Sequence, residues 1–350
     1  MTKKVKIGSV TIGSGNPIAV QSMTNTETKD VKSTVAQIKR LEDAGCEIIR
    51  CSVPDIQSAL SLKKIKEQIK IPLVADIHYD YRLAIEALKN GVDKIRINPG
   101  NIGGVDRLRE VINAAKEREA VIRIGVNSGS LKSNINYKLK VKSEDDTANL
   151  MVASLMEYVE FFEGENFTNM VISLKASDVL TTIEAYRLFI KMRDYPLHIG
   201  ITESGTELGG VIKSSIGSGI LLSEGIGDTI RVSLTTKPEM EVYVAYRILN
   251  SLRLRERGVT IISCPTCART EIDVIKIAHE VEKATMNISK PLKIAVMGCS
   301  VNGPGEASHA DLGLTGSKSI GVIFKKGKII KKVKKKDLLK EFLKELKKII

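Results

Sequence analysis

Between residue 17 and about residue 254, short apolar segments alternate with amphipathic ones in an unbroken series. The apolar segments are PIAVQSM, EIIRCSV, PLVADIH, DKIRINP, AVIRIGVN, MVISLKAS, LHIGITES and TIRVSLT, and each is followed by a segment with helical periodicity. This alternation is typical of a parallel sheet, and eight such units match a (β/α)8 barrel. A doubly wound open sheet is the alternative, but no glycine-rich dinucleotide loop follows the first strand. The sequence therefore predicts an α/β chain whose N-terminal domain, residues 1–255, is a TIM barrel.

Residues 256–350 have a different pattern and predict a second, smaller α/β domain. A strand GVTIISC, a helix EIDVIKIAHEVEKAT and a strand PLKIAVMGC precede a glycine-rich loop. The final stretch DLLKEFLKELKKII places its apolar residues on one stripe, which predicts a docked terminal helix with a solvated basic face. Those residues are Leu338, Leu339, Phe342, Leu346 and Ile349.

The positive charge of the chain is concentrated at its C-terminal end. Residues 325–350 hold twelve lysines against Asp337, Glu341 and Glu345, so they carry +9 of the net +13. An acidic partner such as a small electron carrier is one interpretation, because lysine patches steer such encounters. Nucleic acid is less favoured, since aromatic residues make up only 4% of the chain and no binding motif is present.

The composition also indicates a cellular setting. No apolar stretch reaches the ~20 residues that span a bilayer, and the start MTKKVKIGSV lacks the features of a signal peptide. Five cysteines, an odd number in a long chain, fit a reducing compartment better than a disulfide framework. We expect a cytoplasmic protein without membrane segments.

One parity of the predicted barrel strands is polar where Val, Ile and Leu are usual. The residues at these positions are Arg50, Ser52, Asp76, His78, Arg96, Asn98, Arg123, Asn127, Ser173, Lys175, Ser177, Arg231 and Ser233. Five of them are cations, and the nearby acids are Asp76 and Glu203. Unpaired buried charge is costly and guanidinium groups bind phosphate in a bidentate fork, so a small phosphate or diphosphate ester is the expected ligand.

Three residues of this predicted mouth are candidates for proton transfer. They are Asp76, His78 and Glu203, with His78 favoured because an unperturbed imidazole titrates near pH 6.5. We expect His198 to be structural. A Schiff base on Lys175 is an alternative that ranks below phosphate binding, because nothing in the sequence signals a desolvated amine.

The second domain carries cysteines at metal-ligand spacing. Cys264 and Cys267 stand in SCPTCART, and Cys299 opens CSVNGPGE. Structural zinc, completed by His279 or His309, is one interpretation. An iron-sulfur cluster is the other; it normally takes four thiolates, and the carboxylate of Glu306 is a candidate for the last position. Cys46 and Cys51 are expected to pack within the barrel.

These segments together resemble the 4-hydroxy-3-methylbut-2-en-1-yl diphosphate synthase family of the non-mevalonate isoprenoid pathway, in its compact bacterial two-domain form. The resemblance rests on VQSMTNT, RINPGN, GVNSGSL, ITESG, SCPTCAR and CSVNGPGE, which cover nearly the whole chain. It implies reductive dehydration and ring opening of 2-C-methyl-D-erythritol 2,4-cyclodiphosphate, with two electrons from reduced flavodoxin or ferredoxin. It also implies a 4Fe-4S cluster on Cys264, Cys267, Cys299 and Glu306, in a domain resembling the cluster domain of sulfite and nitrite reductases.

The resemblance further implies substrate contacts and an assembly. The matching positions here are Arg50, Asp76, His78, Arg96, Asn98, Arg123, Asn127, Lys175, Glu203 and Ser233, and the cationic pattern adds Arg231. Glu203 or a neighbour would supply the proton for the departing hydroxyl group. The family forms homodimers in which the cluster domain of one subunit faces the barrel of the other. A barrel phosphate-ester lyase or isomerase with a structural zinc domain remains the alternative function.

Overall fold

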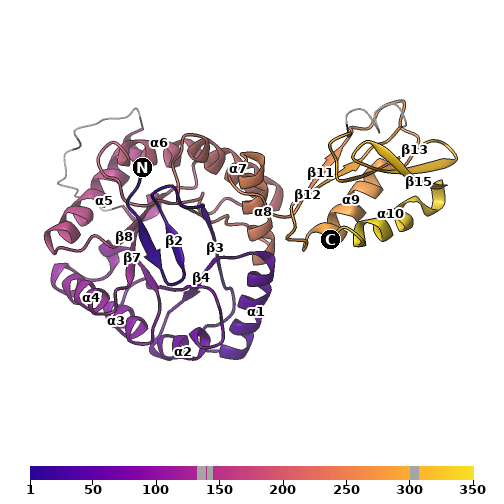
Figure 1. Ribbon diagram of the computed structural model, residues 1–350. Helices are drawn as coiled ribbons and strands as arrows, with labels where there is room; N and C mark the ends of the chain where they lie inside the picture. Colours follow the sequence, from indigo (N-terminus) through magenta and orange to yellow (C-terminus); the bar gives the residue numbers. More distant parts are fainter. Residues whose placement is uncertain (132–138, 140–144, 300–306) are drawn as a thin grey trace. The chain divides into compact units, whose positions relative to one another are not determined.

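The computed structural model describes residues 1–131, 139, 145–299 and 307–350, and it divides into two compact units, Met1–Arg255 and Glu256–Ile350 (Figure 1). Glu306 and most of the connection 128–146 lie outside the described residues. None of the described helices is long and apolar enough to cross a membrane.

The first unit is a barrel of eight parallel strands, which confirms the predicted fold. The strands are β3 (Ala19–Met23), β4 (Ile48–Ser52), β5 (Leu73–Asp76), β6 (Lys94–Ile97), β7 (Val121–Asn127), β8 (Met170–Lys175), β9 (His198–Ile199) and β10 (Thr229–Ile230). They follow the order β8-β7-β6-β5-β4-β3-β10-β9. A bridge between Ile172 and Leu197, with the Ile172 N–H donating to the Pro196 carbonyl at 2.9 Å, joins the two ends.

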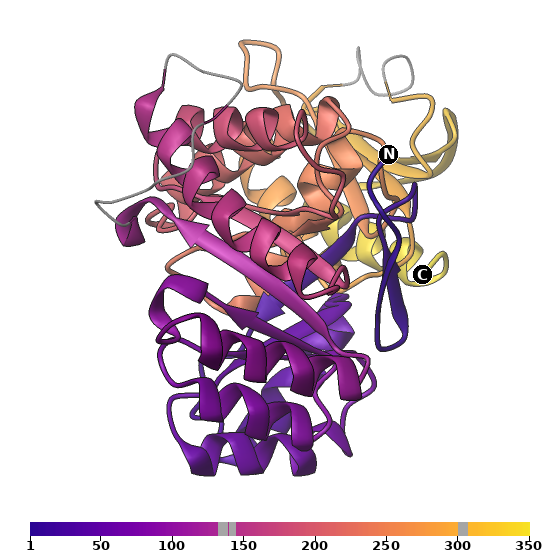
Figure 2. The ribbon, with the colours of Figure 1, turned by 90° about the vertical axis from the view of Figure 1, so that its left-hand side faces the viewer.

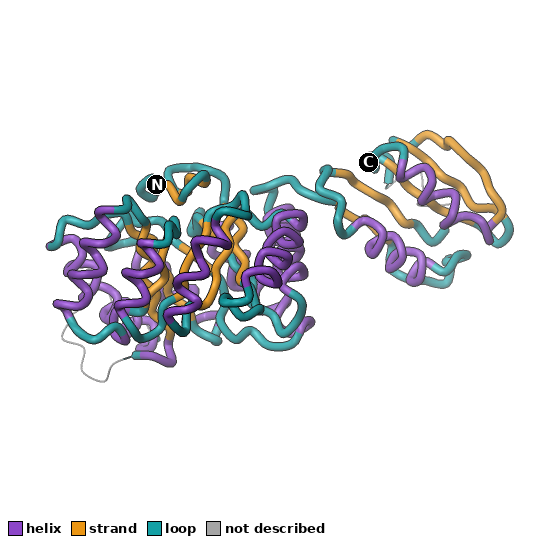
Figure 3. Tube along the Cα trace, turned by 90° about the horizontal axis from the view of Figure 1, so that it is seen from below, coloured by secondary structure: helices purple, strands orange, loops and turns teal. Residues whose placement is uncertain are grey.

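A ring of helices surrounds these strands (Figure 3). The helices are α1 (Val31–Ala44), α2 (Ile56–Lys66), α3 (Tyr81–Lys89), α4 (Val105–Glu117), α5 (Asp146–Gly164), α6 (Val179–Phe189), α7 (Glu207–Ser223) and α8 (Pro238–Ser251), with short 3-10 turns at Pro99–Asn101 and Ser128–Ser130. Aspartate side chains cap the first turns of α1, α2, α3, α5 and α6. Such caps accept otherwise unpaired N–H groups and fix where each helix begins.

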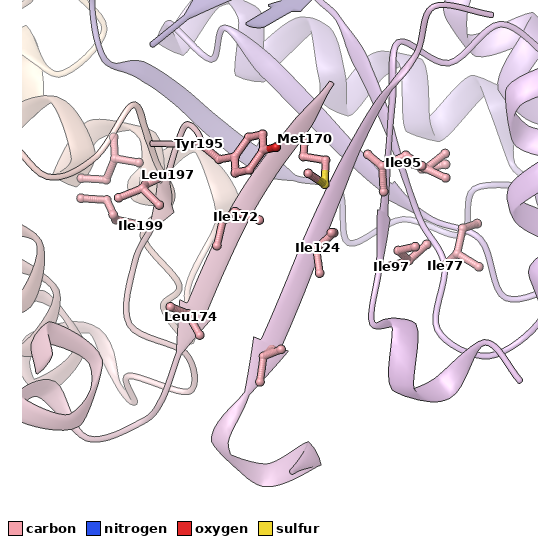
Figure 4. Packing of buried hydrophobic residues seen from close by; sticks show 14 of the residues in the cluster. Ile77, Ile95, Ile97, Ile124, Met170, Ile172, Leu174, Tyr195, Leu197 and Ile199 are labelled. Atoms are coloured by element: carbon pink, nitrogen blue, oxygen red, sulfur yellow. The ribbon is translucent and has the colours of Figure 1, made fainter. Parts of the chain in front are cut away.

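The main hydrophobic core lies between the strands and the helices. Residues of outward parity in the strands or directly after them, among them Ile77, Ile95, Ile97 and Ile124, are completely buried there (Figure 4). The opposite parity of the same strands points into the barrel and is therefore free to carry polar groups at one end.

An N-terminal hairpin that the sequence did not predict closes the other end of the barrel. Strands β1 (Val5–Ile7) and β2 (Val10–Ile12) pair antiparallel and cross this end (Figures 1 and 2). The hairpin packs on the first inward-facing residues of the strands, which are Ala19, Ile48, Val74, Val121 and Val171. The hairpin thus covers mostly apolar residues, although Lys94 is paired in register with Val74 and Val121, and most other inward-facing charges lie toward the carboxyl ends of the strands.

The second unit is a five-stranded sheet covered on one face by two helices. Its strands are β11 (Val259–Ser263), β12 (Leu292–Val296), β13 (Leu312–Gly316), β14 (Ile320–Lys325) and β15 (Lys328–Lys334), in that order. The first three run parallel, and β14 and β15 are antiparallel additions. Helices α9 (Val274–Thr285) and α10 (Leu338–Lys347) pack on one face, and a 3-10 turn at Lys335–Asp337 precedes α10.

The lysine-rich tail therefore contains a strand as well as the expected helix. Leu338, Phe342 and Leu346 of α10 are buried against the sheet, as the apolar stripe predicts. The preceding lysines lie on β15, whose burial alternates only weakly because it is an edge strand. Because of that weak alternation, the sequence pattern did not predict the hairpin formed by β14 and β15.

The N-terminal β1–β2 hairpin allows a test of how the barrel is closed. Ile12 is completely buried, so Ile12→Ala should lower the free energy of unfolding by ~2–5 kcal/mol, as expected for a deleted core side chain. Urea unfolding measures this change. The matched variant Val105→Ala, at a position that is 57% exposed, should stay within about 0.5 kcal/mol of the parent. Equal effects of the two substitutions would show that the hairpin does not seal the barrel.

Candidate functional site

The structure brings the predicted cations together inside the carboxyl-terminal end of the barrel. Arg50, Arg96, Arg123 and Lys175 come from four different strands, and none of them is more than 9% exposed. The strand register pairs Asp76 with Arg96 and Arg96 with Arg123. Active sites of TIM barrels lie at this end. This carboxyl-terminal end of the barrel interior, with its charged residues, is called the barrel mouth below.

Asp76 is the central acid of the barrel mouth. Its Oδ1 accepts a hydrogen bond from Arg96 Nη1 at 3.2 Å, and its Oδ2 lies 3.7 Å from Arg50 Nε and 3.3 Å from His78 Nε2. Burial alone would raise the pKa of Asp76, but Arg50, the hydrogen bond to His78 and Arg96 together hold this pKa well below its usual range. Asp76 is therefore a carboxylate that ties two guanidinium groups and the half-exposed His78 together.

A second buried carboxylate comes from a helix rather than from a strand. Glu241 of α8 is 7% exposed, and its Oε2 lies 3.9 Å from Arg231 Nη2. Burial raises the pKa of Glu241, while Arg231 opposes that shift. The expected second acid, Glu203, is instead exposed, with left-handed backbone at φ 49°. The buried counter-charge is thus Glu241, which the strand pattern could not reveal.

The cations of the mouth exceed what these two carboxylates balance. Burial and the neighbouring cations lower the pKa of Arg123 and Lys175 well below their ordinary values, and burial lowers that of Arg50 to about 10. Among the described residues, Arg123 Nε and Nη1, Arg96 Nε and Arg231 Nε are buried without a hydrogen-bond partner. Buried donors of this kind are normally satisfied, so the arrangement calls for an anion.

Two glycines make room for these cations. A Cβ on Gly125 would lie 2.9 Å from Ser173 Oγ and 3.3 Å from Arg96 Nε. A Cβ on Gly200, whose φ is +149°, would lie 2.2 Å from the Arg231 carbonyl oxygen and 2.9 Å from Lys175 Nζ. A side chain at either position would displace a group that faces the mouth.

Sequence reasoning missed a polar layer deeper in the barrel. Lys94 is completely buried and donates to Gln21 Oε1 at 3.1 Å. Burial, Arg123 and Arg50 lower the pKa of Lys94 well below its ordinary value. His198 is also completely buried, and neither ring nitrogen has a partner in the described part of the chain. Lys94 stands two residues before Arg96, so the parity that found Arg96 also identifies Lys94.

The remaining predicted residues lie around the mouth. Asn98 is buried, and its Oδ1 accepts a hydrogen bond from the Gly100 N–H at 3.2 Å. Asn127 ends β7 and is paired in register with Lys175. Ser233 is partly buried, and its carbonyl accepts a hydrogen bond from the Ser204 hydroxyl.

The charge balance of the mouth predicts a large effect of Asp76→Asn. This change leaves Arg50 and Arg96 buried without their carboxylate, so we expect a loss of ~3–5 kcal/mol in the free energy of unfolding. Glu224→Gln, which breaks a surface pair with Arg187, should cost at most about 1 kcal/mol. Denaturant titration compares the two variants, and an Asp76→Asn protein as stable as Glu224→Gln would contradict the central role of Asp76.

In the second unit, Cys264 and Cys299 lie at the carboxyl ends of the neighbouring strands β11 and β12. This end of the sheet is called the cysteine edge below. Cys264 follows β11 and Cys299 lies just beyond β12, and the two strands run parallel with Ser263 opposite Val296. The Gly298 N–H donates to Cys264 Sγ at 3.0 Å, and the Cys299 carbonyl accepts from Thr315 Oγ1 at 2.6 Å. An N–H directed at a cysteine sulfur is the outer contact that iron-sulfur sites use.

Cys267 lies in the exposed turn that follows Cys264. Its N–H donates to Thr270 Oγ1 at 3.0 Å. Hydrogen bonds from the backbone and side chain of Arg269 lower the pKa of the Cys267 thiol, which favours the thiolate that binds metals. Cys46 and Cys51 are buried in the barrel core, where burial raises their thiol pKa values to about 12 and about 11. These two cysteines are packing residues.

The donor set at this edge is made of sulfur and fits a thiolate-bound metal group. His279 and His309, the candidates for a zinc site, are both exposed. Within the described ranges, no three His, Cys, Asp or Glu side chains already form a group that could hold a metal ion. Glu306, the predicted oxygen ligand, lies outside these ranges.

Comparisons with known proteins match the whole chain. The family models described as the GcpE TIM-barrel domain and the GcpE protein C-terminal domain match residues 2–246 and 260–348. A protein of Caldanaerobacter subterraneus subsp. tengcongensis is 58% identical over 100% of this chain and 98% of its own length. A protein of Clostridium acetobutylicum is 56% identical over 99% of this chain and 98% of its own. Both are named 4-hydroxy-3-methylbut-2-en-1-yl diphosphate synthase (flavodoxin).

Two solved structures resemble about seven tenths of this chain. The dihydropteroate synthase of Yersinia pestis matches with a TM-score of 0.51 and 11% identity, over 72% of this chain and 99% of its own. The dihydropteroate synthase of Stenotrophomonas maltophilia also has a TM-score of 0.51 and 11% identity, over 71% and 99%. At such low identity these matches support the fold and no activity.

Proposed function

The chain belongs to the GcpE family of 4-hydroxy-3-methylbut-2-en-1-yl diphosphate synthases, oxidoreductases of isoprenoid biosynthesis, and we propose how its residues carry out that reaction. The substrate is 2-C-methyl-D-erythritol 2,4-cyclodiphosphate. The ring opens reductively and a hydroxyl group leaves as water, which yields 4-hydroxy-3-methylbut-2-enyl diphosphate. The observation that carries the proposal is the group of buried, unbalanced cations in the barrel mouth.

The cations bind the diphosphate group. Arg123 and Arg96 offer N–H groups without partners in the described part of the chain, and such donors satisfy phosphoryl oxygens. Arg50, Lys175 and Arg231 complete the clamp, with Asn98, Asn127 and Ser233 at its rim. Because Asp76 fixes Arg50 and Arg96, the clamp is ordered before the substrate arrives, which lowers the entropic cost of binding.

We assign proton transfer to residues of the barrel mouth and of the loop after β9. Asp76 holds His78 through the 3.3 Å contact with its Nε2, so the imidazole is oriented while half of its side chain stays exposed. Glu203 lies in the loop after β9 with left-handed backbone, a conformation that concentrates at functional sites. We assign the proton for the departing hydroxyl group to Glu203, with His78, which Asp76 orients, as the second candidate.

We propose that the cofactor is a 4Fe-4S cluster, which Cys264, Cys267, Cys299 and Glu306 would hold. When bound, such a cluster supplies electrons one at a time. The Gly298 N–H donates to Cys264 Sγ, and a Cβ on Gly298 would lie 3.4 Å from that sulfur and 3.1 Å from Thr270 Cγ2. Glu306 adds an oxygen ligand to three thiolates.

The electrons come from a reduced carrier protein, flavodoxin or ferredoxin. Names of relatives specify flavodoxin for those proteins. We further assign the chain to the cytoplasm and to a homodimer in which the cluster domain of one subunit faces the barrel of the other. In that assembly residues 1–255 bind the substrate and residues 256–350 bind the cluster.

Iron content tests the cofactor and the function together. Protein purified without oxygen should be brown, contain about four irons per chain and convert the cyclic diphosphate with two electrons from a chemical reductant. Cys264→Ser should lose most of the iron, whereas Cys46→Ser, which removes a buried packing thiol, should keep it. Zinc without iron in the parent protein would refute the proposal and favour the lyase or isomerase alternative.

Substrate affinity tests the clamp separately. Arg123→Gln removes unpaired guanidinium donors, so the dissociation constant of the cyclic diphosphate should rise by ~10–100-fold, the effect of losing hydrogen bonds to a charged group. Calorimetry on the cluster-free protein measures this without turnover. The control is Arg118→Gln, at an exposed arginine after α4, which should leave the affinity unchanged. Equal affinities in the two variants would remove Arg123 from the clamp.

A further inference from the structure

Exposed lysines are concentrated on and beside the edge strand β15 of the second unit. The lysine ridge is our name for the exposed lysines Lys325, Lys328, Lys332, Lys334, Lys335 and Lys336. Most of them lie on β15 or next to it, and β15 is at the end of the sheet. Ile329 and Ile330, which are 51% and 45% exposed, interrupt the lysines on the same strand.

Two of the acids near this surface are engaged elsewhere, and a third, Asp337, directly follows Lys336 in the chain. Glu341 and Glu345 of α10 form salt bridges with Lys331, Lys344 and Lys348. None of these three lysines belongs to the ridge. The ridge charges therefore face solvent instead of the acids of α10, and an external partner with complementary charge can meet them.

Strand pairing connects the lysine ridge with the end of the sheet that carries the cysteines. Thr315 Oγ1 donates to the Cys299 carbonyl, Thr315 is paired with Val322, and Val322 is paired with Lys332. Neighbouring strands are about 4.8 Å apart, so Lys332 lies two strand spacings, roughly 10 Å, from Thr315.

A second connection runs through Lys335. Its Nζ donates to the Glu271 carbonyl at 2.7 Å, and the Glu271 N–H donates to the Gly298 carbonyl at 2.9 Å. Gly298 is the residue whose own N–H contacts Cys264 Sγ. A protein seated on the ridge would therefore lie close to the proposed cluster.

The composition of the surface favours a protein over a nucleic acid. Both phenylalanines of residues 256–350, Phe324 and Phe342, are completely buried, and these residues contain no tyrosine or tryptophan, so the large rings usual for base stacking are not exposed. Exposed isoleucines among lysines instead match a protein interface with an apolar centre and a charged rim. Opposite charge on the partner would also speed encounter.

We propose that the lysine ridge is the docking surface for an acidic electron-carrier protein, a proposal that rests on the redox function proposed above. Lysine side chains steer the carrier, and Ile329 and Ile330 provide the apolar contact. Each docked carrier would pass one electron to the cluster proposed beside the cysteines and would itself be oxidised, so two carriers would supply the two electrons of the reaction.

Charge reversal tests the ridge in the full-length, cluster-loaded enzyme. The triple variant Lys328→Glu, Lys332→Glu, Lys334→Glu is compared with a matched triple variant on exposed barrel lysines, Lys63→Glu, Lys64→Glu, Lys89→Glu. With a purified acidic flavodoxin as donor, kcat/KM for the flavodoxin should fall by at least ~10-fold in the ridge variant and stay within about twofold in the barrel variant. The salt dependence of kcat/KM should weaken only in the ridge variant.

A small donor separates docking from catalysis. Reduced methyl viologen needs no docking surface, so viologen-driven turnover should be unchanged in both triple variants. Absence of viologen-driven turnover in the parent enzyme would refute the proposed function itself. Equal flavodoxin kcat/KM in the two variants would overturn the docking proposal alone.

Two further measurements guard this test. Thermal unfolding checks that the ridge variant is folded, and Lys328→Gln, Lys332→Gln, Lys334→Gln gives a milder substitute that should still lower flavodoxin kcat/KM more than the barrel variant does. Binding of a single-stranded RNA oligonucleotide is measured in parallel. RNA binding that is lost in the ridge variant while flavodoxin turnover is kept would assign the ridge to nucleic acid and overturn the proposal.

Discussion

The buried cations of the barrel mouth repel one another, and two buried carboxylates of the first unit offset part of this repulsion. Asp76 balances part of the charge by contacting Arg50, Arg96 and His78 from a single carboxylate. Glu241 approaches Arg231 from the helix side. What remains is a set of donors without protein partners in the described structure, and this residual positive charge is what we propose a diphosphate balances.

The fold can hold this charge because the apolar parts of the barrel surround it. The β1–β2 hairpin seals the opposite end over Val74, Val121 and Val171, so the polar interior opens toward one side. Outward-facing isoleucines pack the strands against the helices and keep the strand register fixed. Gly125 and Gly200 leave space beside Arg96 and Lys175 that a larger residue would fill.

Much of this arrangement could be predicted from the sequence, because strand parity is a local property. The period-two pattern indicated Arg50, Arg96 and Arg123 as inward-facing residues, and the βα rhythm indicated the barrel. Glu241 was missed because it enters from a helix, where no strand pattern applies. Lys94 shares the parity of Arg96 but stands at the start of its strand, and the predicted site did not extend to that deeper layer of the barrel.

The second unit was harder to predict. Strand β15 was missed because an edge strand needs no buried face of its own, so lysines occupy positions that alternation would assign to apolar residues. Strand β14 lies inside the sheet and was missed although its segment IGVIFK is apolar. The hairpin at the start of the chain was missed for a related reason: each of its strands is only three residues long. In both cases the pairing partner, and not the local sequence, determines the strand.

The central claim is that the barrel mouth is an anion site whose charge is balanced by a diphosphate. The most direct measurement is the thermal unfolding midpoint of the cluster-free protein as inorganic diphosphate is added at constant ionic strength. A ligand that binds only the folded state raises this midpoint with the logarithm of its concentration. The account predicts such a rise, larger for diphosphate than for sulfate, and an unfolding midpoint that does not respond to diphosphate would contradict it.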